Sequence, residues 1–187
     1  MDVSDVLLPG IHNVDNYMTA IAVTDGLVSR ETIRHVARTF GGVEHRIELV
    51  REKNGVRFYN DSIASSPTRT IAGLRSFSEK VILIVGGYDK HIPFDVLGPE
   101  ICAHVKKLFL GGATGPKIAE AVRNCPAYDE NALPIVDCGN FEAVVRAAAA
   151  AAEDGDVVLM SPASAAFDQF KNFMVRGEFY KKLVREL

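Results

Sequence analysis

Cysteines and long apolar runs are scarce in this sequence, and both scarcities exclude classes of protein. The three cysteines, Cys102, Cys125 and Cys138, form no C-x-x-C pair and have no metal-ligand spacing with histidines. We therefore expect reduced residues of a cytoplasmic protein, neither disulfide partners nor metal ligands. The five histidines show no H-E-x-x-H pattern, so we predict no metal site built by this chain.

The sequence also lacks a strong bias of charge. Its formal net charge is −3, and its 21 lysines and arginines are scattered, which argues against a nucleic-acid surface and a polybasic membrane anchor. The apolar run at residues 81–85 has the length of a strand and is far too short to span a bilayer. No signal segment opens the chain. These absences predict a cytoplasmic protein without nucleic-acid or membrane partners.

Three catalytic signature motifs are missing as well. The glycine-rich residues 111–117 fail the phosphate-loop pattern G-x-x-x-x-G-K-[ST], because Pro116 replaces the second glycine and Ile118 follows the lysine. No G-x-G-x-x-G follows the first expected strand, which argues against a dinucleotide-binding redox module. No serine lies in a G-x-S-x-G elbow, which argues against a serine hydrolase.

The chain of 187 residues is long enough for one α/β domain with a short appendage, and residues 1–38 form that appendage. Asn13 or Asp15 is expected to cap a helix that Gly26 ends. Ser29 is expected to cap a second helix. Two helices cannot bury their apolar faces alone, so we expect this segment to pack against another part of a protein.

From residue 43 onward, strand-like stretches alternate with helix-like stretches. Residues 47–50 and 56–59 flank Lys53-Asn54-Gly55, which is typical of a hairpin. Further strands are expected at 81–85, 107–110, 133–136 and 157–160, and helices at 67–77, 94–104, 116–124, 141–152 and 170–186. The apolar strands indicate a mostly parallel sheet covered on both faces. The predicted fold class is α/β, a Rossmann-like doubly wound sheet with an antiparallel hairpin at its start.

Polar or glycine-rich segments follow three of the expected strands and begin at Asn60, Gly86 and Ser161. Ligands of open α/β sheets bind beyond the carboxyl ends of the strands, so we expect the three segments to converge on one site. Lys90, close to the end of its strand, is suited to neutralise a carboxylate or a phosphate. Each segment also has a plainer explanation: an Asx turn at Asp61, a sharp glycine turn, or a solvated lysine.

Five segments, in the same order along the chain, resemble motifs of the Mur ligases, which are ATP-dependent ligases of bacterial cell-wall synthesis. They are HNVDN at residues 12–16, FGGVEHR at 40–46, NDS at 60–62, GGYDK at 86–90 and SPASAAFDQFKNF at 161–173, followed by Arg176-Gly177. The last segment is similar to the signature of the D-glutamate-adding members in particular.

The resemblance implies a ligase that phosphorylates a carboxylate of UDP-N-acetylmuramoyl-L-alanine with ATP and Mg²⁺ and then joins it to D-glutamate. Residues 1–38 would end the central ATP-binding domain, and residues 39–187 would form the carboxyl-terminal domain, which binds D-glutamate and closes over ATP. The implied D-glutamate contacts are Lys90, Ser65, Ala166, Phe167 and Phe173. The implied ATP contacts are Asn13, Asn16, His45, Arg46 and Asp61.

Several positions depart from the family pattern. Ile63 stands where the family has lysine, Ser65 where it has threonine and Ser66 where it has asparagine. Ala166 replaces a serine that would bind the acceptor, and Ser164 fills a cysteine position. Whether Ser161 or Ser164 replaces the lost hydroxyl stays open at this point.

Two alternatives remain beside the D-glutamate ligase. A Mur ligase for another acceptor, such as a diamino acid, would carry a DNPR-like loop, which is absent. A non-catalytic interaction module would keep only the fold, against which the three polar strand ends argue. The ATP-phosphate loop, the modified catalytic lysine and the UDP-binding domain of such a ligase are expected to precede Met1. We therefore expect the chain to contact a central domain and to be inactive by itself.

Overall fold

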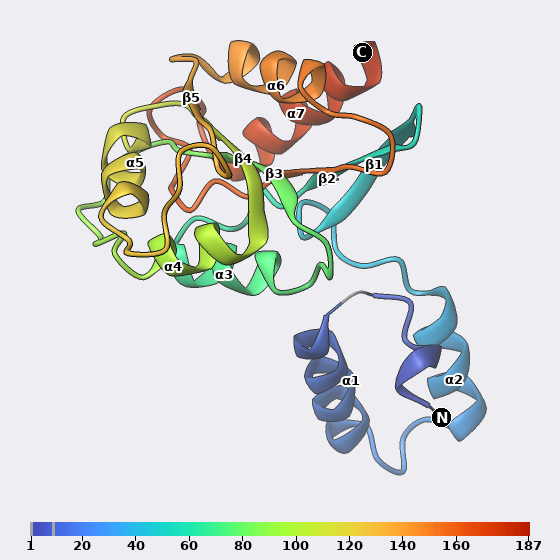
Figure 1. Cartoon of the computed structure of the whole chain (residues 1–187). Coiled ribbons are helices and arrows are strands. Elements are labelled where there is room, and N and C mark those ends of the chain that lie inside the picture. Colours follow the sequence, from blue (N-terminus) through green and yellow to red (C-terminus); the bar gives the residue numbers. More distant parts are fainter. Residues whose placement is uncertain (1, 9) are drawn as a thin grey trace. The chain divides into compact units, whose positions relative to one another are not determined.

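The computed structural model describes residues 2–8 and 10–187, and the chain forms two compact units, Met1–Val43 and Glu44–Leu187. The amino-terminal unit contains a short 3-10 helix at Val3–Asp5, α1 at Ile11–Val23 and α2 at Arg30–Thr39 (Figure 1). Ser29 caps α2 as predicted, since its hydroxyl accepts a hydrogen bond from the Thr32 amide over 3.1 Å.

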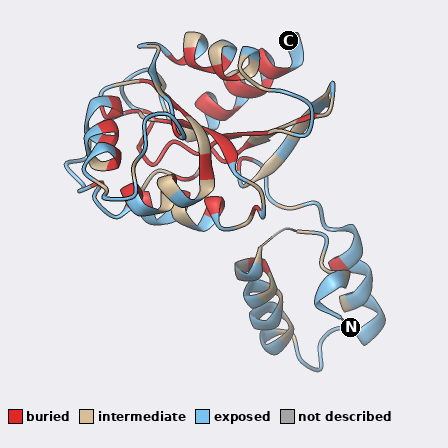
Figure 2. Ribbon diagram, in the orientation of Figure 1, coloured by how far each residue is buried: buried red, intermediate tan, exposed pale blue. Residues whose placement is uncertain are grey.

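The first helix begins earlier than predicted. Its N-cap is Gly10, at a φ of 95° that favours glycine, so Asn13 and Asp15 lie within α1 and not at its start. Asn13 and Ala37 are the buried residues among those described in this unit (Figure 2). Two buried residues do not give this unit a hydrophobic core of its own.

The carboxyl-terminal unit is built on a six-stranded sheet with the order β1-β2-β6-β3-β4-β5. The strands are β1 Glu48–Lys53, β2 Val56–Asn60, β3 Val81–Val85, β4 Val105–Leu110, β5 Ile135–Asp137 and β6 Val157–Met160. Only the β1–β2 pair is antiparallel, and the other described pairs are parallel. Asn54 and Gly55 make the tight turn of the hairpin with φ values of 51° and 74°. The predicted mixed sheet and its opening hairpin are confirmed.

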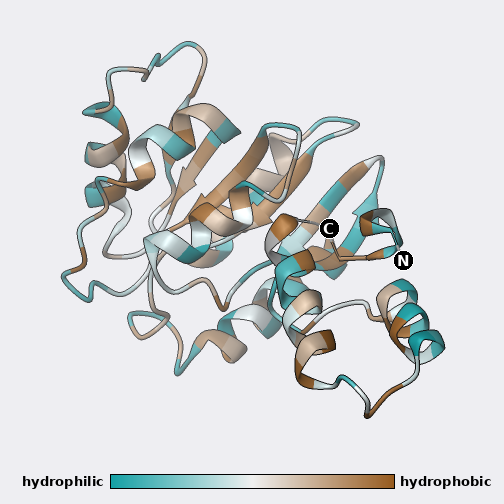
Figure 3. Ribbon diagram, turned by 90° about the horizontal axis from the view of Figure 1, so that it is seen from below, coloured by the Kyte–Doolittle hydropathy of each residue, from teal (hydrophilic) through white to brown (hydrophobic). Residues whose placement is uncertain are grey.

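Helices cover both faces of this sheet. They are α3 Pro67–Leu74, α4 Leu97–His104, α5 Gly115–Arg123, α6 Phe141–Ala150 and α7 Phe173–Glu186. The side chains of strand β3 alternate between the two faces of the sheet. Val81, Leu83 and Val85 pack with α3, α4 and α5 on one face. Ile82 and Ile84 pack with α6 and α7 on the other face. All five side chains are buried, and each contributes about 1.5–3 kcal/mol. Figure 3 shows the hydrophobic strands at the centre of this unit.

Two helices start later than the sequence pattern indicated. The helix predicted from residue 94 starts at Leu97, and the one predicted from residue 170 starts at Phe173, where Asn172 caps it by accepting from the Val175 amide. Among the described helices, none combines the length and apolar character needed to cross a bilayer.

Candidate functional site

Three loops meet at the carboxyl edge of the sheet, where β2, β6 and β3 lie side by side. The loops are residues 61–66 after β2, 86–96 after β3 and 161–172 after β6. The strands are parallel, with Asn60 opposite Met160 and Met160 opposite Ile84. Neighbouring parallel strands deliver the segments that follow them to one edge. The convergence expected from the sequence is therefore confirmed.

Asp61 joins the first of these loops to the third from inside the protein. Its carboxylate accepts a hydrogen bond from the Ser161 hydroxyl over 2.7 Å and one from the Ile47 amide over 3.4 Å. It also packs against Gly73 of α3, where an added Cβ would lie 2.9 Å from a carboxylate oxygen. Burial raises the pKa of Asp61 to about 7, although both hydrogen bonds lower it. The buried Asp61 side chain therefore links the first loop to the third loop.

The second loop is bound to the third through backbone groups. The Gly86 amide donates to the carbonyl of Pro162, and the Tyr88 amide donates to the carbonyl of Ala165, both over 2.9 Å. Gly87 lies between them with a φ of 152°, and an added Cβ would lie 2.3 Å from the Ala165 oxygen. Glycine at this position therefore permits the close approach of the two chains.

Arg176, in the first turn of α7, binds the first and third loops together with one buried guanidinium. Its Nε and Nη2 donate to the hydroxyl and carbonyl oxygens of Ser62, and its Nη1 donates to the carbonyls of Ser164 and Ala165 at 3.1 and 3.2 Å. Burial lowers the pKa of Arg176 to about 10, while the nearby Asp168 carboxylate raises it. The planar fork satisfies several backbone acceptors at once, which an ammonium cannot do in the same geometry.

A pocket opens where the three loops meet, and we call it the rim pocket. Its lining residues are Ser65, Tyr88, Lys90, Ile92, Phe94, Ala163, Ser164 and Ala165. Lys90 is exposed and makes no ion pair with any described residue, because the neighbouring Asp89 is held by Lys117 over 2.5 Å. The rim pocket thus combines an uncommitted ammonium with a serine hydroxyl and apolar walls.

The other three residues implied to bind D-glutamate do not line this pocket. Ala166 is buried, and its carbonyl accepts from the Phe170 amide over 2.8 Å. Phe167 is 60% exposed beside Tyr88. Phe173 starts α7, and its ring lies edge-on to His45 with centroids 6.0 Å apart. The structure therefore places Lys90 and Ser65 in the lining of one pocket, and these three residues outside that lining.

The residues implied to bind ATP fall in both units. In α1, Asn16 donates to the side-chain oxygen of Asn13 over 3.4 Å, one turn apart. In the carboxyl-terminal unit, Arg46 is exposed, whereas His45 and Asp61 are buried. His45 has a φ of 65°, in the left-handed region. Of these three residues, Arg46 has the exposed cationic group that can contact a phosphate without a change in conformation.

A charged cluster surrounds His45. The buried ammonium of Lys181 binds Glu44, Glu178 at 2.7 Å and Glu48 at 3.4 Å. Burial acts to lower the pKa of Lys181, but these carboxylates outweigh it and the pKa is raised. Glu44, His45 and Glu178 are close enough to share a metal ion. The Lys181 ammonium already provides the positive charge among those carboxylates, so they do not form a suitable magnesium site.

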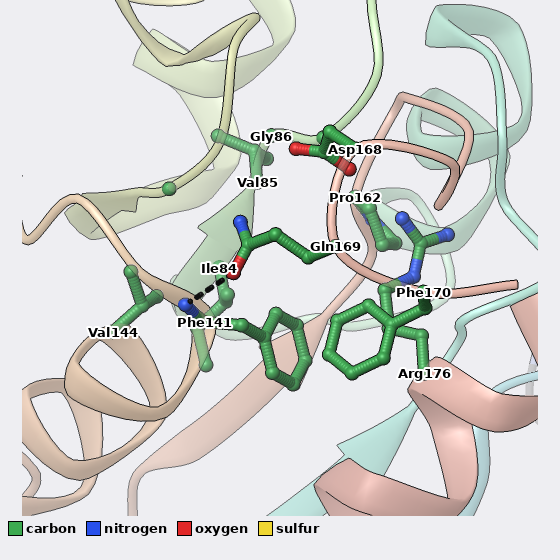
Figure 4. Close-up of a pocket in the computed structure, with 12 residues that line it drawn as sticks. Ile84, Val85, Gly86, Phe141, Val144, Pro162, Asp168, Gln169, Phe170 and Arg176 are labelled. Carbon is green, nitrogen blue, oxygen red and sulfur yellow. Dashed lines mark hydrogen bonds between the residues drawn. The ribbon is translucent and has the colours of Figure 1, made fainter.

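A second pocket lies between the third loop and α6 (Figure 4). Its walls are mostly apolar, and they include Ile84, Val144 and Phe170. The carboxamide oxygen of Gln169 accepts a hydrogen bond from the Phe141 amide at the start of α6, over 3.1 Å. The polar groups here fix the third loop, so the rim pocket is the better site for an anionic ligand.

The sequence interpretation did not assign a role to Arg176 or to Tyr88. Arg176 belongs to the quoted motif, yet no local pattern shows that its side chain turns inward to bind residues from two loops. Tyr88 stands between the two glycines and the lysine of the GGYDK segment at residues 86–90. Its proximity to Lys90 in sequence was the one available signal.

Comparisons with known proteins agree with this geometry. Residues 45–164 match the family described as Mur ligase, glutamate ligase domain. The chain is 56% identical over 186 residues to the UDP-N-acetylmuramoylalanine--D-glutamate ligase of Acetivibrio thermocellus, covering 98% of the chain and 40% of that protein. The corresponding ligase of Ruminiclostridium cellulolyticum is 53% identical over 184 residues, with 97% and 40% covered. The chain thus spans about 40% of the length of these relatives.

The fold is also found among solved structures. A pseudomurein peptide ligase type C from Methanothermus fervidus superimposes with a TM-score of 0.64 at 16% identity, covering 97% of the chain and 37% of that protein. At this level of identity the likeness concerns the fold alone.

Proposed function

Because this chain belongs to the Mur ligase family, we propose that it is the carboxyl-terminal part of a ligase that joins D-glutamate to UDP-N-acetylmuramoyl-L-alanine with ATP. In this proposal, residues 1–38 end the central ATP-binding domain and residues 39–187 form the acceptor-binding domain. The observation that carries it is the rim pocket at the carboxyl edge of the sheet, whose lining includes both Lys90 and Ser65.

The rim pocket suits one end of a small dianion. Lys90 pairs with one carboxylate of D-glutamate, and Ser65 donates a hydrogen bond to the same group. The other carboxylate is held by backbone groups near Ala166 and Phe167, with Phe173 as a wall. These assignments rest on the resemblance together with the positions of the loops.

Ser164 is our choice for the hydroxyl lost at Ala166. The Ser161 hydroxyl is already hydrogen-bonded to two side chains, Asp61 at 2.7 Å and Thr70 at 3.0 Å, so it does not face a ligand. Ser164 lines the rim pocket and shares a single hydrogen bond, of 2.8 Å, with the Thr114 hydroxyl. Its hydroxyl can therefore turn toward a ligand while still accepting from Thr114.

The ATP side of the proposal comprises Asn13 and Asn16 on the adenine and His45, Arg46 and Asp61 toward the ribose and phosphates. Arg46 is exposed and ready for such a contact. His45 and Asp61 are buried, so direct contact by either residue requires its own loop to rearrange when the nucleotide binds. The Mg²⁺ that accompanies ATP is assigned no ligand from the described residues of this chain.

The proposed reaction has two steps. A carboxylate oxygen of UDP-N-acetylmuramoyl-L-alanine attacks the γ-phosphorus of ATP, and the bond from that phosphorus to ADP breaks. The neutral amine of D-glutamate then attacks the acyl carbon, phosphate leaves, and the new amide nitrogen loses a proton. This chain contributes by placing the amine, because holding two reactants in line supplies a large part of a rate enhancement. We propose a cytoplasmic location, where ATP is available.

The test uses the complete ligase in which this chain is the carboxyl-terminal part, and it measures D-glutamate-dependent phosphate release. Lys90→Ala should raise the KM for D-glutamate by about tenfold to a hundredfold, because a charge-assisted hydrogen bond is worth roughly 1.5–3 kcal/mol. The exposed Lys182→Ala, remote in sequence from the pocket, is the control. The isolated chain should release no phosphate.

Two results would count against these assignments in different ways. An unchanged KM in Lys90→Ala would remove Lys90 from the acceptor site while leaving the family function intact. Phosphate release by the complete ligase that does not depend on D-glutamate would reject the proposed acceptor itself.

A further inference from the structure

Two exposed aromatic side chains form a pair at the mouth of the rim pocket. Tyr88 follows β3 and Phe167 follows β6, and their ring centroids lie 5.9 Å apart with an interplanar angle of 72°. The two residues are 44% and 60% exposed, respectively. An edge-to-face pair of this kind is favourable by about 0.5–1.5 kcal/mol, so each ring restrains the other. Exposed aromatic surface beside a pocket is typical of a binding site.

The backbone of Tyr88 is fixed on both sides. Its amide donates to the Ala165 carbonyl over 2.9 Å, and the carbonyl of the preceding Gly87 accepts from the Thr114 amide over 3.0 Å. The following residue, Asp89, pairs with Lys117. The ring therefore projects from a backbone segment with little freedom to move away when a ligand enters.

We propose that Tyr88 determines specificity by limiting the length of the acceptor amino acid, an inference that rests on the proposed function. Tyr88 lines the rim pocket together with Lys90 and Ser65, which hold one carboxylate of the acceptor. Once that end is fixed, the aliphatic chain of the acceptor extends along the pocket, and a rigid ring in the wall sets the space for it. A longer dicarboxylic amino acid would meet the ring.

The ring, and not its hydroxyl, carries this role. Within the described part of the chain, no hydrogen bond involves the Tyr88 hydroxyl, so the pairing with Phe167 is what places the side chain. Tyr88→Phe keeps the wall, whereas Tyr88→Ala removes it. One methylene in a fitted pocket changes selectivity by about tenfold to two-hundredfold, which sets the size of the expected effect.

The experiment compares D-glutamate with D-2-aminoadipate, which is one methylene longer, as acceptors of the complete ligase. The measured quantity is the ratio of their kcat/KM values. Tyr88→Ala should reduce the preference for D-glutamate at least tenfold, and Tyr88→Phe should retain the wild-type ratio. Phe167→Ala, which frees the ring, should reduce the preference by a smaller factor. Leu49→Ala is the matched control, since Leu49 is an apolar residue 51% exposed on β1.

The possible results separate this inference from the function on which it rests. A ratio in Tyr88→Ala within twofold of wild type overturns the role of Tyr88, and so does a loss of preference in Tyr88→Phe as large as in Tyr88→Ala. If the wild-type ligase does not consume D-glutamate at all, the proposed function fails before the variants are compared.

Discussion

The guanidinium of Arg176 donates hydrogen bonds to both the hydroxyl and the carbonyl oxygen of Ser62, over 3.0 and 2.9 Å. These residues are 114 positions apart in the sequence. The same guanidinium reaches the carbonyls of Ser164 and Ala165. One side chain therefore fixes the distance between the loop that carries Ser65 and the loop that forms another wall of the rim pocket.

Arg176→Lys should lower the free energy of unfolding of the chain by about 2–4 kcal/mol, because several buried acceptors lose their donors. Urea denaturation followed by circular dichroism measures this change. Arg185→Lys, at an exposed position of the same helix, should stay within about 0.5 kcal/mol of wild type. Equal stability of the two variants would mean that the Arg176 contacts contribute nothing in solution.

Asp61 should make the chain less stable as the pH rises. Its pKa is raised from 3.8 to about 7, so the folded chain holds this proton more tightly than the unfolded chain. The free energy of unfolding should then fall between about pH 4 and pH 7, by up to roughly 1 kcal/mol per pH unit. Below and above this range, the contribution of Asp61 to the free energy of unfolding should be constant.

Asp61→Asn isolates this contribution from other titrating groups. The amide keeps an oxygen for the Ile47 amide and can donate to the Ser161 hydroxyl. The stability of the variant relative to wild type should increase between about pH 4 and pH 7. A difference that does not change over this range would show that the Asp61 carboxyl titrates normally.

Gly177→Ala should destabilise the chain by about 1–3 kcal/mol through overpacking. An added Cβ would lie 2.3 Å from the Nδ1 atom of the buried His45 ring, which leaves no room for a methyl group. Alanine favours helix by up to about 1 kcal/mol over glycine, so the net loss is reduced accordingly. Gly41→Ala is the control, since no atom lies within 4 Å of the added Cβ. A more stable Gly177→Ala would show that His45 moves aside at little cost.

Tyr180→Phe should raise the free energy of unfolding by about 1 kcal/mol, because it removes a buried hydroxyl that has no partner. The Tyr180 hydroxyl is the buried side-chain group that lacks a hydrogen bond among the residues described. Burial raises its pKa well above the ordinary value. Thermal and urea denaturation compare it with Tyr128→Phe, where the ring is only partly buried. A destabilised Tyr180→Phe would indicate an ordered water bound to the hydroxyl.

The architecture of the carboxyl-terminal unit could be predicted because its signals are local and consistent. The run Val81–Val85 is apolar throughout, and Asn54-Gly55 permits the positive φ values of the hairpin turn. The convergence of the three loops followed from parallel strands alone. The start of α7 was placed too early, because the phenylalanine at 170 belongs to the loop and packs beside Phe141 with ring centroids 5.1 Å apart.

The candidate site was harder to predict, because its chemistry depends on partners distant in the sequence. The pattern of α7 marks Arg176 and Lys181 as charged residues, yet both are buried. Their partners, Ser62 and Glu44, lie more than 100 residues earlier. Likewise, the commitment of Asp89 to Lys117 leaves Lys90 available, and no local rule distinguishes these two neighbours.

The strand order has a consequence for synthesis of the protein. Strand β6 is the last to be made, yet it lies between β2 and β3. On the ribosome, the first two loops, which follow β2 and β3, are translated long before the strand that lies between these two strands. A chain that ends before Val157 therefore lacks the strand that aligns these two loops, and the rim pocket can form only after residues 157–165 have been made.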